Sequence, residues 1–349
     1  WRRAVAAGLT KGSGIPASTI DRLLASTAGG RLPDRCVLVV DESGMVGTRM
    51  LARLLDLAAA SRAKVVLVGD HRQLPEIAAG GAFAGLARNL GAATLRRNRR
   101  QIERWERDAL ADLRDGDPQR AIDRYVKEGR VHVGDDARAV RRRMVDDWWE
   151  GRTQGKEVLI LAGRHTQVEA LNRLCRKRLR DEGELGDDEV VAGGRRFATG
   201  DTVMAGYNDY RLGLLNGTRG TVTAIDTRRG RVQVATDDGR SVDVPRRYLE
   251  LGRLVHGYAT TVHKAQGATV DSTLLLVDDQ SYREAAYTGL SRGRMANRVY
   301  VVSDDAEAAV HAPRQDVADG LATLRDAVRR SGAQQMATPR IGRGGGMRP

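Results

Sequence analysis

Hydrophobic positions in the first half of the chain follow two periods, one typical of strands and one of helices. Two valine-rich runs, Cys36–Val40 and Lys64–Gly69, flank the stretch Thr48–Ala60, where apolar residues recur at helical spacing. This order predicts a βαβ unit with a parallel sheet, in which we expect Val37–Val40 to be a buried strand. A further apolar run at Glu157–Gly163, followed by a helical pattern, predicts a second α/β segment.

The pattern changes between Gly200 and Leu251, where short alternating stretches are separated by Gly and Asp-Gly turns. Such a pattern predicts a small antiparallel β module of the barrel type. Apolar runs at Thr273–Asp279 and Arg298–Asp305 then restore the α/β pattern, so we expect the β module to be inserted within the second α/β domain. Helices are also expected near the start, over the charged segment Ile102–Trp149, and after Pro313, before a tail typical of disorder or a linker.

The composition is that of a globular protein with a strong positive charge. A chain of 349 residues with 41% apolar and 30% charged residues can form two or three domains, and no apolar run is long enough to span a membrane. The net charge of +13 favours nucleic acid as a partner, ahead of an acidic membrane, although a general arginine bias is the alternative. Cys36 and Cys175 suit neither a disulfide framework nor a zinc site, and fit a cytoplasmic protein with both thiols in its core.

Polar residues follow the first two predicted strands at their carboxyl ends. Asp41 and Glu42 follow the first strand, and Asp70 and Gln73 follow the second. Parallel neighbouring strands would bring these four side chains to one sheet edge, where ligands bind in α/β folds. An aspartate can hold Mg²⁺ through water, a glutamate can activate a water molecule, and a glutamine can contact a γ-phosphate. The alternative is that the acidic pair only opens a loop.

The sequence contains no phosphate-binding loop that these acids would serve. Such a loop needs Gly-x-x-x-x-Gly-Lys-Ser/Thr, so that backbone N–H groups surround the phosphate oxygens and the lysine reaches them. Lys156 follows a glycine, but Glu157 occupies the place of the Mg²⁺-binding hydroxyl and the segment precedes a strand. Because the sequence also starts at Trp1, we expect a longer protein with this loop upstream, and negligible ATP hydrolysis by this polypeptide alone.

Several segments closely resemble the ordered motifs of superfamily 1 helicases. The fifth and sixth motifs are matched by "YATTVHKAQGATVD" (Tyr258–Asp271) and "AYTGLSRGR" (Ala286–Arg294). The second, third and fourth are matched by "VVDESGM", "GDHRQL" and "RNRRQ" (Arg97–Gln101), and "GIPASTIDRLL" is similar to the motif that follows the P-loop. The resemblance is to the RecD-like branch, whose members generally move 5′→3′ and carry an SH3-like barrel before the fifth motif. Within it, "HKAQGATVD" looks most like the helicase part of conjugative relaxases.

This resemblance implies that ATP and Mg²⁺ bind between two lobes. The implied catalytic residues are Glu42 as general base, Gln73 as γ-phosphate sensor, and Arg100 and Arg292 as arginines that approach the γ-phosphate. The implied nucleotide-binding residues are Asp41 (the Mg²⁺ ligand), Gly69, Asp70, Lys264, Gln266 and Gly267. Arg100 could instead belong to a solvated basic face, and Arg294 competes with Arg292. Thr269 stands where many relatives carry a ribose-contacting glutamate, so that contact is not expected here.

Single-stranded and duplex DNA are the partners that the resemblance implies. The residues assigned to nucleic acid are Thr19, Asn216, Tyr258, Thr261 and His263. Hydroxyl and imidazole groups can hold phosphates without reading sequence. Two alternatives stay open: His263 could be a core histidine, and Asn216 with the following glycine could serve only as a hairpin turn.

The expected fold class is α/β, with tandem RecA-like (P-loop NTPase) domains, the first of them incomplete, and an inserted SH3-like β-barrel. The expected domains are RecA-like domain 1 (1–110), a helical connector (111–155), RecA-like domain 2 (156–199 and 253–305), the β insertion (200–252) and a C-terminal helix with its tail (306–349). The expected function is that of a DNA helicase motor from a conjugative relaxase, whose relaxase domain would lie upstream. The alternatives are a non-catalytic single-stranded DNA-binding remnant and a RecD-type recombination helicase.

Overall fold

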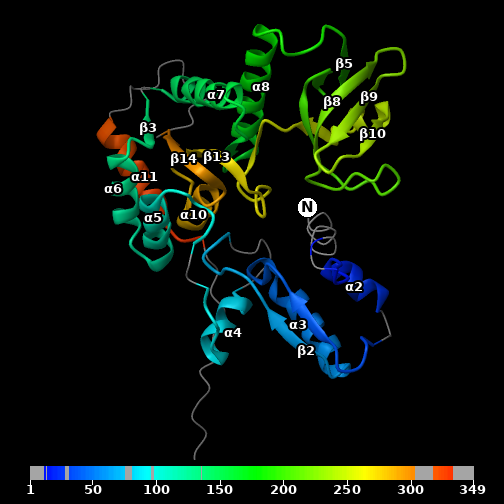
Figure 1. The fold of residues 1–349 in the computed structure, drawn as a ribbon, viewed down its shortest axis with the longest axis vertical. Coiled ribbons are helices and arrows are strands. Elements are labelled where there is room, and N and C mark those ends of the chain that lie inside the picture. Colours follow the sequence, from blue (N-terminus) through cyan, green and yellow to red (C-terminus); the bar gives the residue numbers. More distant parts are fainter. Residues whose placement is uncertain are drawn as a thin grey trace, which may run out of the picture. The chain divides into compact units, whose positions relative to one another are not determined.

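The computed structural model describes residues 12, 14–27, 31–74, 81–95, 98–134, 136–302 and 317–332. The chain divides into a small unit, mainly residues 20–96, and a large unit, mainly residues 97–331 (Figure 1). The two units meet between residues 96 and 97, earlier than the domain boundary expected after residue 110. Residue 110 lies within a helix of the large unit, Arg104–Asp115. The expected domain ranges otherwise remain predictions. The first expected helix lies mostly outside the described residues, and the expected tail lies almost wholly outside them.

The small unit contains the predicted βαβ arrangement. Its elements are α2 (Ile20–Ser26), β1 (Val37–Val40), the 3-10 helix η1 (Ser43–Met45), α3 (Thr48–Ala60), β2 (Lys64–Leu67) and α4 (Ala82–Leu90). β1 and β2 pair in parallel, so the predicted parallel pairing is confirmed. The helical spacing of apolar residues in α3 places Leu51 and Leu54 in the core beside Val40, which fixes the helix on one face of the sheet.

The prediction that β1 is a buried strand is wrong. Val37 and Val39 are 59% and 61% exposed, and Val68, just after β2, is 45% exposed. Successive side chains of a strand point to opposite faces, and the packed cluster of this unit includes Leu38 and Val40 on the other face. Within the described residues, α3 therefore covers one face of the β1–β2 pair and the other face is exposed. A run of valines in the sequence does not show whether one or both faces of a strand are covered.

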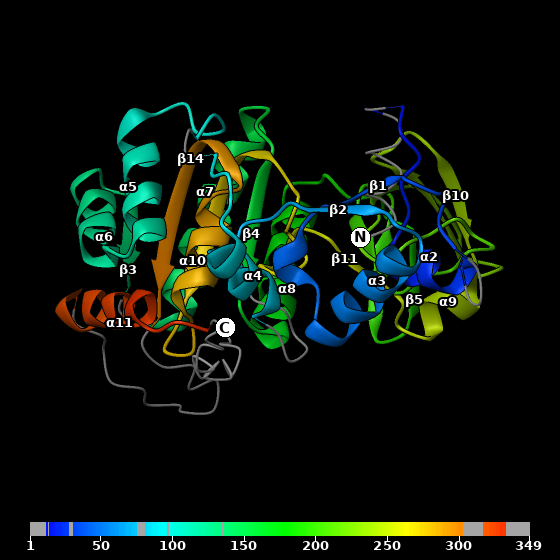
Figure 2. The same cartoon turned by 90° about the horizontal axis from the view of Figure 1, so that it is seen from below.

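The large unit is built on a five-stranded parallel sheet with strand order β12-β4-β13-β14-β3 (Figure 2). Its strands are β3 (Val131–Val133), β4 (Val158–Ala162), β12 (Ala259–Thr261), β13 (Val270–Val277) and β14 (Gly293–Val301). Its helices are α5 (Arg104–Asp115), α6 (Pro118–Lys127), α7 (Ala137–Thr153), α8 (His165–Asp181), α10 (Arg283–Leu290) and α11 (Val317–Arg329). Helices α7 and α8 cover one face of the sheet, and α10 and α11 pack against the opposite face (Figure 1). Trp148 of α7 and Cys175 of α8 are buried in the core between these helices and the sheet. The prediction of a core thiol is confirmed for Cys175, whereas Cys36 is only half-buried.

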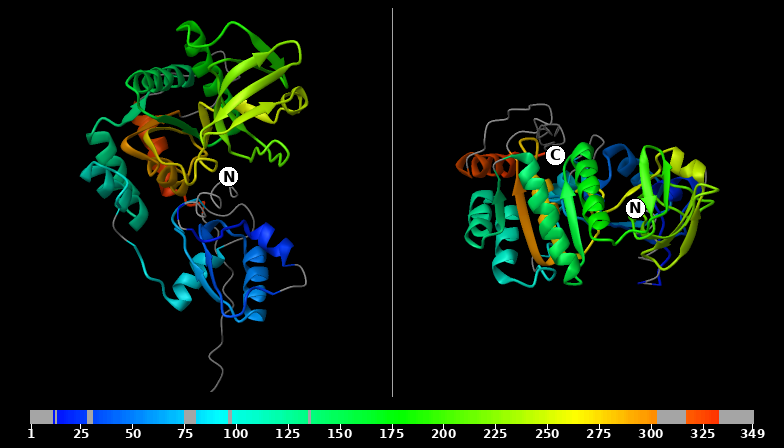
Figure 3. Two further views of the ribbon diagram at one scale, coloured as in Figure 1. Left: turned by 45° about the vertical axis from the view of Figure 1, so that its right-hand side comes forward. Right: turned by 90° about the horizontal axis from the view of Figure 1, so that it is seen from above.

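An antiparallel β module is inserted between α8 and β12 (Figure 3). Its five-stranded sheet has the order β10-β9-β8-β7-β11, with strands β7 (Thr202–Ala205), β8 (Arg219–Asp226), β9 (Arg231–Thr236), β10 (Ser241–Val244) and β11 (Leu254–His256). The hairpin β5 (Glu189–Ala192) and β6 (Arg195–Ala198) and the short helix α9 (Arg246–Glu250) complete it. Because Val190 and Phe197 share a core with Val203, the module starts before Gly200, where we expected it to begin. Among the described helices of the chain, none has the length and apolar character needed to cross a membrane.

Candidate nucleotide and nucleic-acid sites

The loops that follow β1 and β2 are held side by side. The Val68 nitrogen donates a hydrogen bond to the Val40 oxygen at 2.8 Å, and the Ser43 nitrogen donates to the Val68 oxygen at 2.8 Å. A Cβ atom on Gly69 would lie 2.9 Å from the Gly44 nitrogen, closer than real Cβ atoms approach. Gly69 therefore permits the close approach of the two loops, a structural role separate from any nucleotide contact.

Four side chains expected to handle a nucleotide lie on these two loops. Asp41 is exposed, and its Oδ1 accepts a hydrogen bond from the Glu42 nitrogen at 2.8 Å. Glu42 has φ 51° and ψ 39°, a left-handed conformation that is uncommon outside glycine and that clusters at functional sites. The Gln73 amide donates to Asp70 Oδ2 at 3.3 Å. The structure thus brings the four residues to one sheet edge, although their chemical roles stay predictions.

Three further residues with expected nucleotide contacts lie in the turn after β12. Lys264 is half-buried, and burial lowers the pKa of its amine. Gly267 is exposed and has φ 78°, which glycine adopts without strain. Gln266 is fully buried, yet neither its amide nitrogen nor its oxygen has a hydrogen-bond partner within the described residues. A buried amide without a partner typically costs about 1–3 kcal/mol, so this turn keeps a polar group at a cost in stability.

Arg100 and Arg292 lie near each other in the large unit. Arg100 Nη1 donates to the Ser291 oxygen at 2.7 Å, one residue before Arg292 in the sequence. Arg292 is 2% exposed, and its Nε donates to the Thr288 oxygen at 2.9 Å. Arg294, the competing residue, is more exposed and pairs with Asp271 at 2.6 Å, so both arginines are engaged within the large unit and the choice between them stays a prediction.

Two buried amides that sequence reasoning missed hold this loop in place. Gln101 Nε2 donates to the Ser291 oxygen at 3.2 Å and to the Gly293 oxygen at 2.8 Å. Asn297 Oδ1 accepts from the Gly293 nitrogen at 3.0 Å, and its Nδ2 donates to Glu106 at 2.8 Å. Burial raises the pKa of Glu106, although the hydrogen bonds from Asn297 oppose that rise. No local signal could identify these roles, because Gln101 lies about 190 residues from its partners in sequence.

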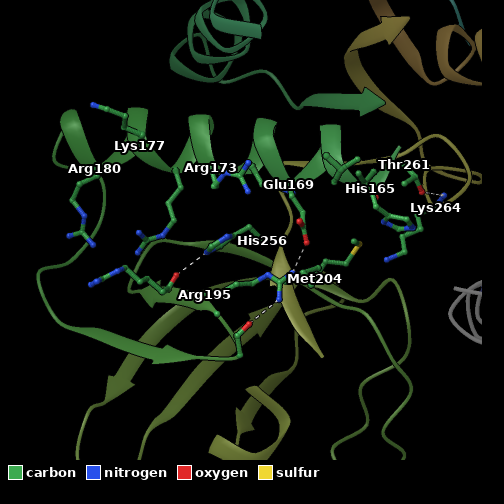
Figure 4. Close-up of a pocket in the computed structure, with 18 residues that line it drawn as sticks. His165, Glu169, Arg173, Lys177, Arg180, Arg195, Met204, His256, Thr261 and Lys264 are labelled. Carbon is green, nitrogen blue, oxygen red and sulfur yellow. Dashed lines mark hydrogen bonds and ion pairs between the residues drawn. The ribbon is translucent and has the colours of Figure 1, made fainter. Parts of the chain in front are cut away.

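A basic groove runs along α8, between that helix and the β module (Figure 4). Its volume is about 730 Å³, and it extends from Thr261 and Lys264 at one end to Arg180 at the other. The stretch of α8 from His165 to Arg180 is about 22 Å long at the usual helical rise. Seven lysine and arginine side chains line the groove, together with the carboxylate of Glu169. The groove therefore suits a long polyanion better than a compact neutral ligand.

The groove contains both paired and unpaired basic side chains. Arg195 pairs with Glu169 at 2.9 Å, and Lys177 pairs with Asp181 at 2.6 Å on the exposed side of α8. Arg173 is exposed and makes no ion pair within the described part of the chain. Exposed ion pairs contribute little to stability, so Lys177 can exchange its partner for a phosphate at low cost.

Asp201 is the centre of a buried network at the edge of this groove. Its carboxylate is fully buried and accepts hydrogen bonds from Arg176 Nε at 3.1 Å, from the Ala198 nitrogen at 2.7 Å and from Tyr258 Oη at 2.6 Å. Tyr258 is only 2% exposed, and its ring packs against Trp148. The expected contact between Tyr258 and DNA is therefore corrected: its ring is inaccessible to a base, and its hydroxyl links β12 to the β module.

The same network predicts an acid-sensitive contribution to stability from Glu189. Burial alone would raise the pKa of Glu189, but hydrogen bonds from Arg176 and Arg196 outweigh it and hold the pKa at about 2. A depressed carboxylate pKa stabilises the fold above the unfolded value near 4.5, and this contribution is lost as pH falls from there towards 2. We expect Glu189→Gln to lose less stability than the wild type over that interval, measured by urea unfolding at several pH values. The exposed Glu250→Gln should behave like the wild type, and equal losses in all three proteins would contradict the prediction.

The other residues assigned to nucleic acid occupy different settings. Thr261 lines the groove, and its Oγ1 accepts a hydrogen bond from the Lys264 nitrogen at 3.3 Å. His263 is half-buried with its pKa lowered by burial, which leaves both readings of this histidine open. Asn216 is exposed in a turn of the β module, and Thr19 is half-buried just before α2. Among these residues, the structure places only Thr261 in the groove.

Comparisons with known proteins agree with the motif resemblance. The AAA domain family matches residues 2–136. The conjugal transfer protein TraA of Rhizobium radiobacter is 36% identical over 302 residues, which cover 84% of this chain and 27% of that protein. The RecBCD enzyme subunit RecD of Mycolicibacterium smegmatis is 31% identical over 343 residues, covering 87% of this chain and 58% of that protein. The chain thus spans about a quarter of the length of the TraA relatives.

Solved structures show the same fold at lower identity. Bacteroides Pif1 bound to single-stranded DNA has a TM-score of 0.51 and 17% identity, covering 86% of this chain and 87% of that one. Pif1 helicase from Candida albicans has a TM-score of 0.50 and 19% identity, covering 85% and 79%. The fold is thus the α/β P-loop helicase fold, with a parallel sheet and an antiparallel β insert. The chain is a homologue of the TraA conjugal transfer proteins and is related, more distantly, to RecD subunits of the RecBCD enzyme.

Proposed function

We propose that this chain is the motor region of an ATP-dependent DNA helicase of a conjugative relaxase, with two RecA-like lobes, an SH3-like insert and 5′→3′ movement on single strands. The observation that carries the proposal is the basic groove, because Thr261 and Lys264 of the fifth motif lie at one of its ends. A single strand in the groove would meet hydroxyl and cationic groups that hold phosphates without reading bases. The RecD and Pif1 relatives, and the single-stranded DNA in a Pif1 structure, support this partner.

The residues at the β1–β2 edge fit the metal and water half of a nucleotide site. Mg²⁺ is usually held by one or two carboxylates together with substrate phosphates, and Asp41 offers an exposed carboxylate at the sheet edge. Bound ATP and Mg²⁺ would supply the phosphoryl group that is transferred to water. Glu42 would orient that water and take its proton, and Gln73 would hydrogen-bond the γ-phosphate. Arg100 and Arg292 would stabilise negative charge, a role that contributes about 10³–10⁵ in rate in phosphoryl transfer generally.

Substitution of Glu42 tests the catalytic part of the proposal. In the protein in which these residues occur naturally, we expect Glu42→Gln to lower DNA-stimulated ATP hydrolysis by about 10²–10⁴, the usual contribution of a general base. The exposed Glu150→Gln on α7 is the matched control and should keep full activity. A Glu42→Gln protein with normal turnover would refute the assigned role.

A second candidate function is single-stranded DNA binding without catalysis. The basic groove along α8 favours it, because holding a strand by its phosphates requires no nucleotide chemistry. The two functions differ in ATP hydrolysis by the natural protein, since a pure binding module would bind DNA equally well with Glu42 or Gln at position 42 and would show no turnover in either form.

A further inference from the structure

The β7–β8 connection, residues 206–218 of the β module, presents an unusual surface. Tyr207 and Tyr210 are 62% and 60% exposed, and within the described residues they are the two aromatic side chains with more than half of their surface in solvent. An exposed aromatic ring loses its favourable burial energy, so two of them on one connection indicate a binding surface more than a packing accident. Neither tyrosine lines the basic groove along α8.

The connection is held in one conformation by hydrogen bonds from outside and inside it. Tyr248 Oη donates to the Tyr207 oxygen at 2.8 Å, and Arg240 Nη1 donates to the Gly213 oxygen at 2.9 Å. Asp209 and Leu214 form a β-bridge across the connection, with N–O distances of 2.7 and 2.9 Å. Because these hydrogen bonds already fix the backbone of the connection, its tyrosine rings lose little conformational entropy when a flat ligand stacks on them.

Positive charge surrounds the two rings. The Arg253 guanidinium lies 5.9 Å from the centre of the Tyr207 ring, within the range of a cation–π contact. Arg211 is exposed between Tyr210 and Leu212, whereas the carboxylate of Asp209 accepts hydrogen bonds from the Arg211 and Leu212 nitrogens. These hydrogen bonds leave the negative charge of Asp209 in place, but Arg211 and Arg253 outnumber it, so the net charge beside the rings is positive.

We propose that Tyr207 and Tyr210 form a base-stacking platform for single-stranded DNA on the β module, with Arg211 and Arg253 contacting the flanking phosphates. This inference rests on the proposed function, because it adds a second contact to the same DNA partner. Every base has a π-face, so stacking on tyrosine tolerates any sequence, and arginines beside the rings complete the usual means of holding a single strand. In duplex DNA the bases are already stacked on one another, so the platform selects single strands.

Binding of fluorescently labelled single strands by the chain, with Tyr207→Ala and Tyr210→Ala, tests the platform. Loss of one stacked base should weaken Kd by roughly 5- to 150-fold, the range for base–aromatic stacking at tenfold per 1.4 kcal/mol. Tyr207→Phe and Tyr210→Phe keep the ring and should bind within about twofold of the wild type. Binding of blunt duplex DNA should be the same for the alanine variants and the wild type.

An oligonucleotide with abasic sites separates stacking from loss of fold. On a fully abasic strand the wild type and the alanine variants should bind equally, because only phosphate contacts remain. If the wild type binds no single-stranded DNA, the proposed function fails. If the wild type binds but both alanine variants bind the normal strand equally well, the platform alone is overturned. A defect of the alanine variants that persists on the abasic strand would also overturn it, since stacking would not be its cause.

Discussion

Replacing Asp201 by alanine should destabilise the large unit by about 3–5 kcal/mol, the usual cost of removing one partner from a buried charged network. The carboxylate is fully buried and joins Arg176 of α8, Tyr258 before β12 and the backbone at Ala198. Its removal leaves the half-buried guanidinium of Arg176 with Glu189 alone and leaves the Tyr258 hydroxyl with only the Thr202 nitrogen, which donates to it at 3.2 Å. A loss of this size is a large fraction of the free energy of unfolding of an ordinary domain, which is about 5–15 kcal/mol.

Urea unfolding followed by tryptophan fluorescence measures this effect. Trp148 lies 5.7 Å from the Tyr258 ring, edge to face, so its emission reports on the network directly. Asp243→Ala is the matched control, because that aspartate is 60% exposed and pairs with Arg231 at the surface of the β module. Exposed pairs of this kind contribute about 0–1 kcal/mol. Equal midpoints for the two alanine variants would show that Asp201 is not the centre of the junction.

Local pattern was enough to predict much of the fold. Thr48–Ala60 is helical over its whole predicted length, because the apolar spacing of this segment matches the single face that it buries. The parallel pairing of β1 and β2 followed from the helix between them. The start of the β module was misplaced, because the hairpin before Gly200 contains a Gly193-Gly194 turn between strands too short to show their alternation clearly.

The candidate sites show where sequence reasoning ends. The acids at Asp41 and Glu42 could be recognised from their position after a strand, and the structure brings them to the same edge as Gln73. Burial of Tyr258 could not be recognised, because it depends on Asp201, 57 residues away in the chain. A motif indicates which family a sequence resembles. The role of each side chain also depends on its packing against residues far away in the sequence, which the motif does not contain.

Removing two positive charges from the groove should weaken DNA binding and make it less sensitive to salt. Arg173 and Lys177 are both exposed on α8 and line the groove one helical turn apart. For single strands, the logarithm of the binding constant falls with the logarithm of salt concentration at a slope of about −0.7 for each phosphate contacted. If each side chain contacts one phosphate, Arg173→Ala with Lys177→Ala should make that slope shallower by about 1.4. At 0.1 M salt the same relation corresponds to a loss of roughly 25-fold in affinity.

A control variant is needed to distinguish DNA binding in the groove from binding by the general positive charge of the chain. Arg228→Ala with Arg229→Ala removes the same two charges from the exposed turn between β8 and β9, outside the groove lining. Because exposed charges farther apart than about 10 Å are largely screened at 0.1 M salt, this control should leave both affinity and slope nearly unchanged. Titrations of a labelled single strand at four or more salt concentrations give both quantities for each protein. Equal slopes for the two double variants would mean that DNA is held by diffuse charge, and the groove would then lose its assignment as the path of the strand.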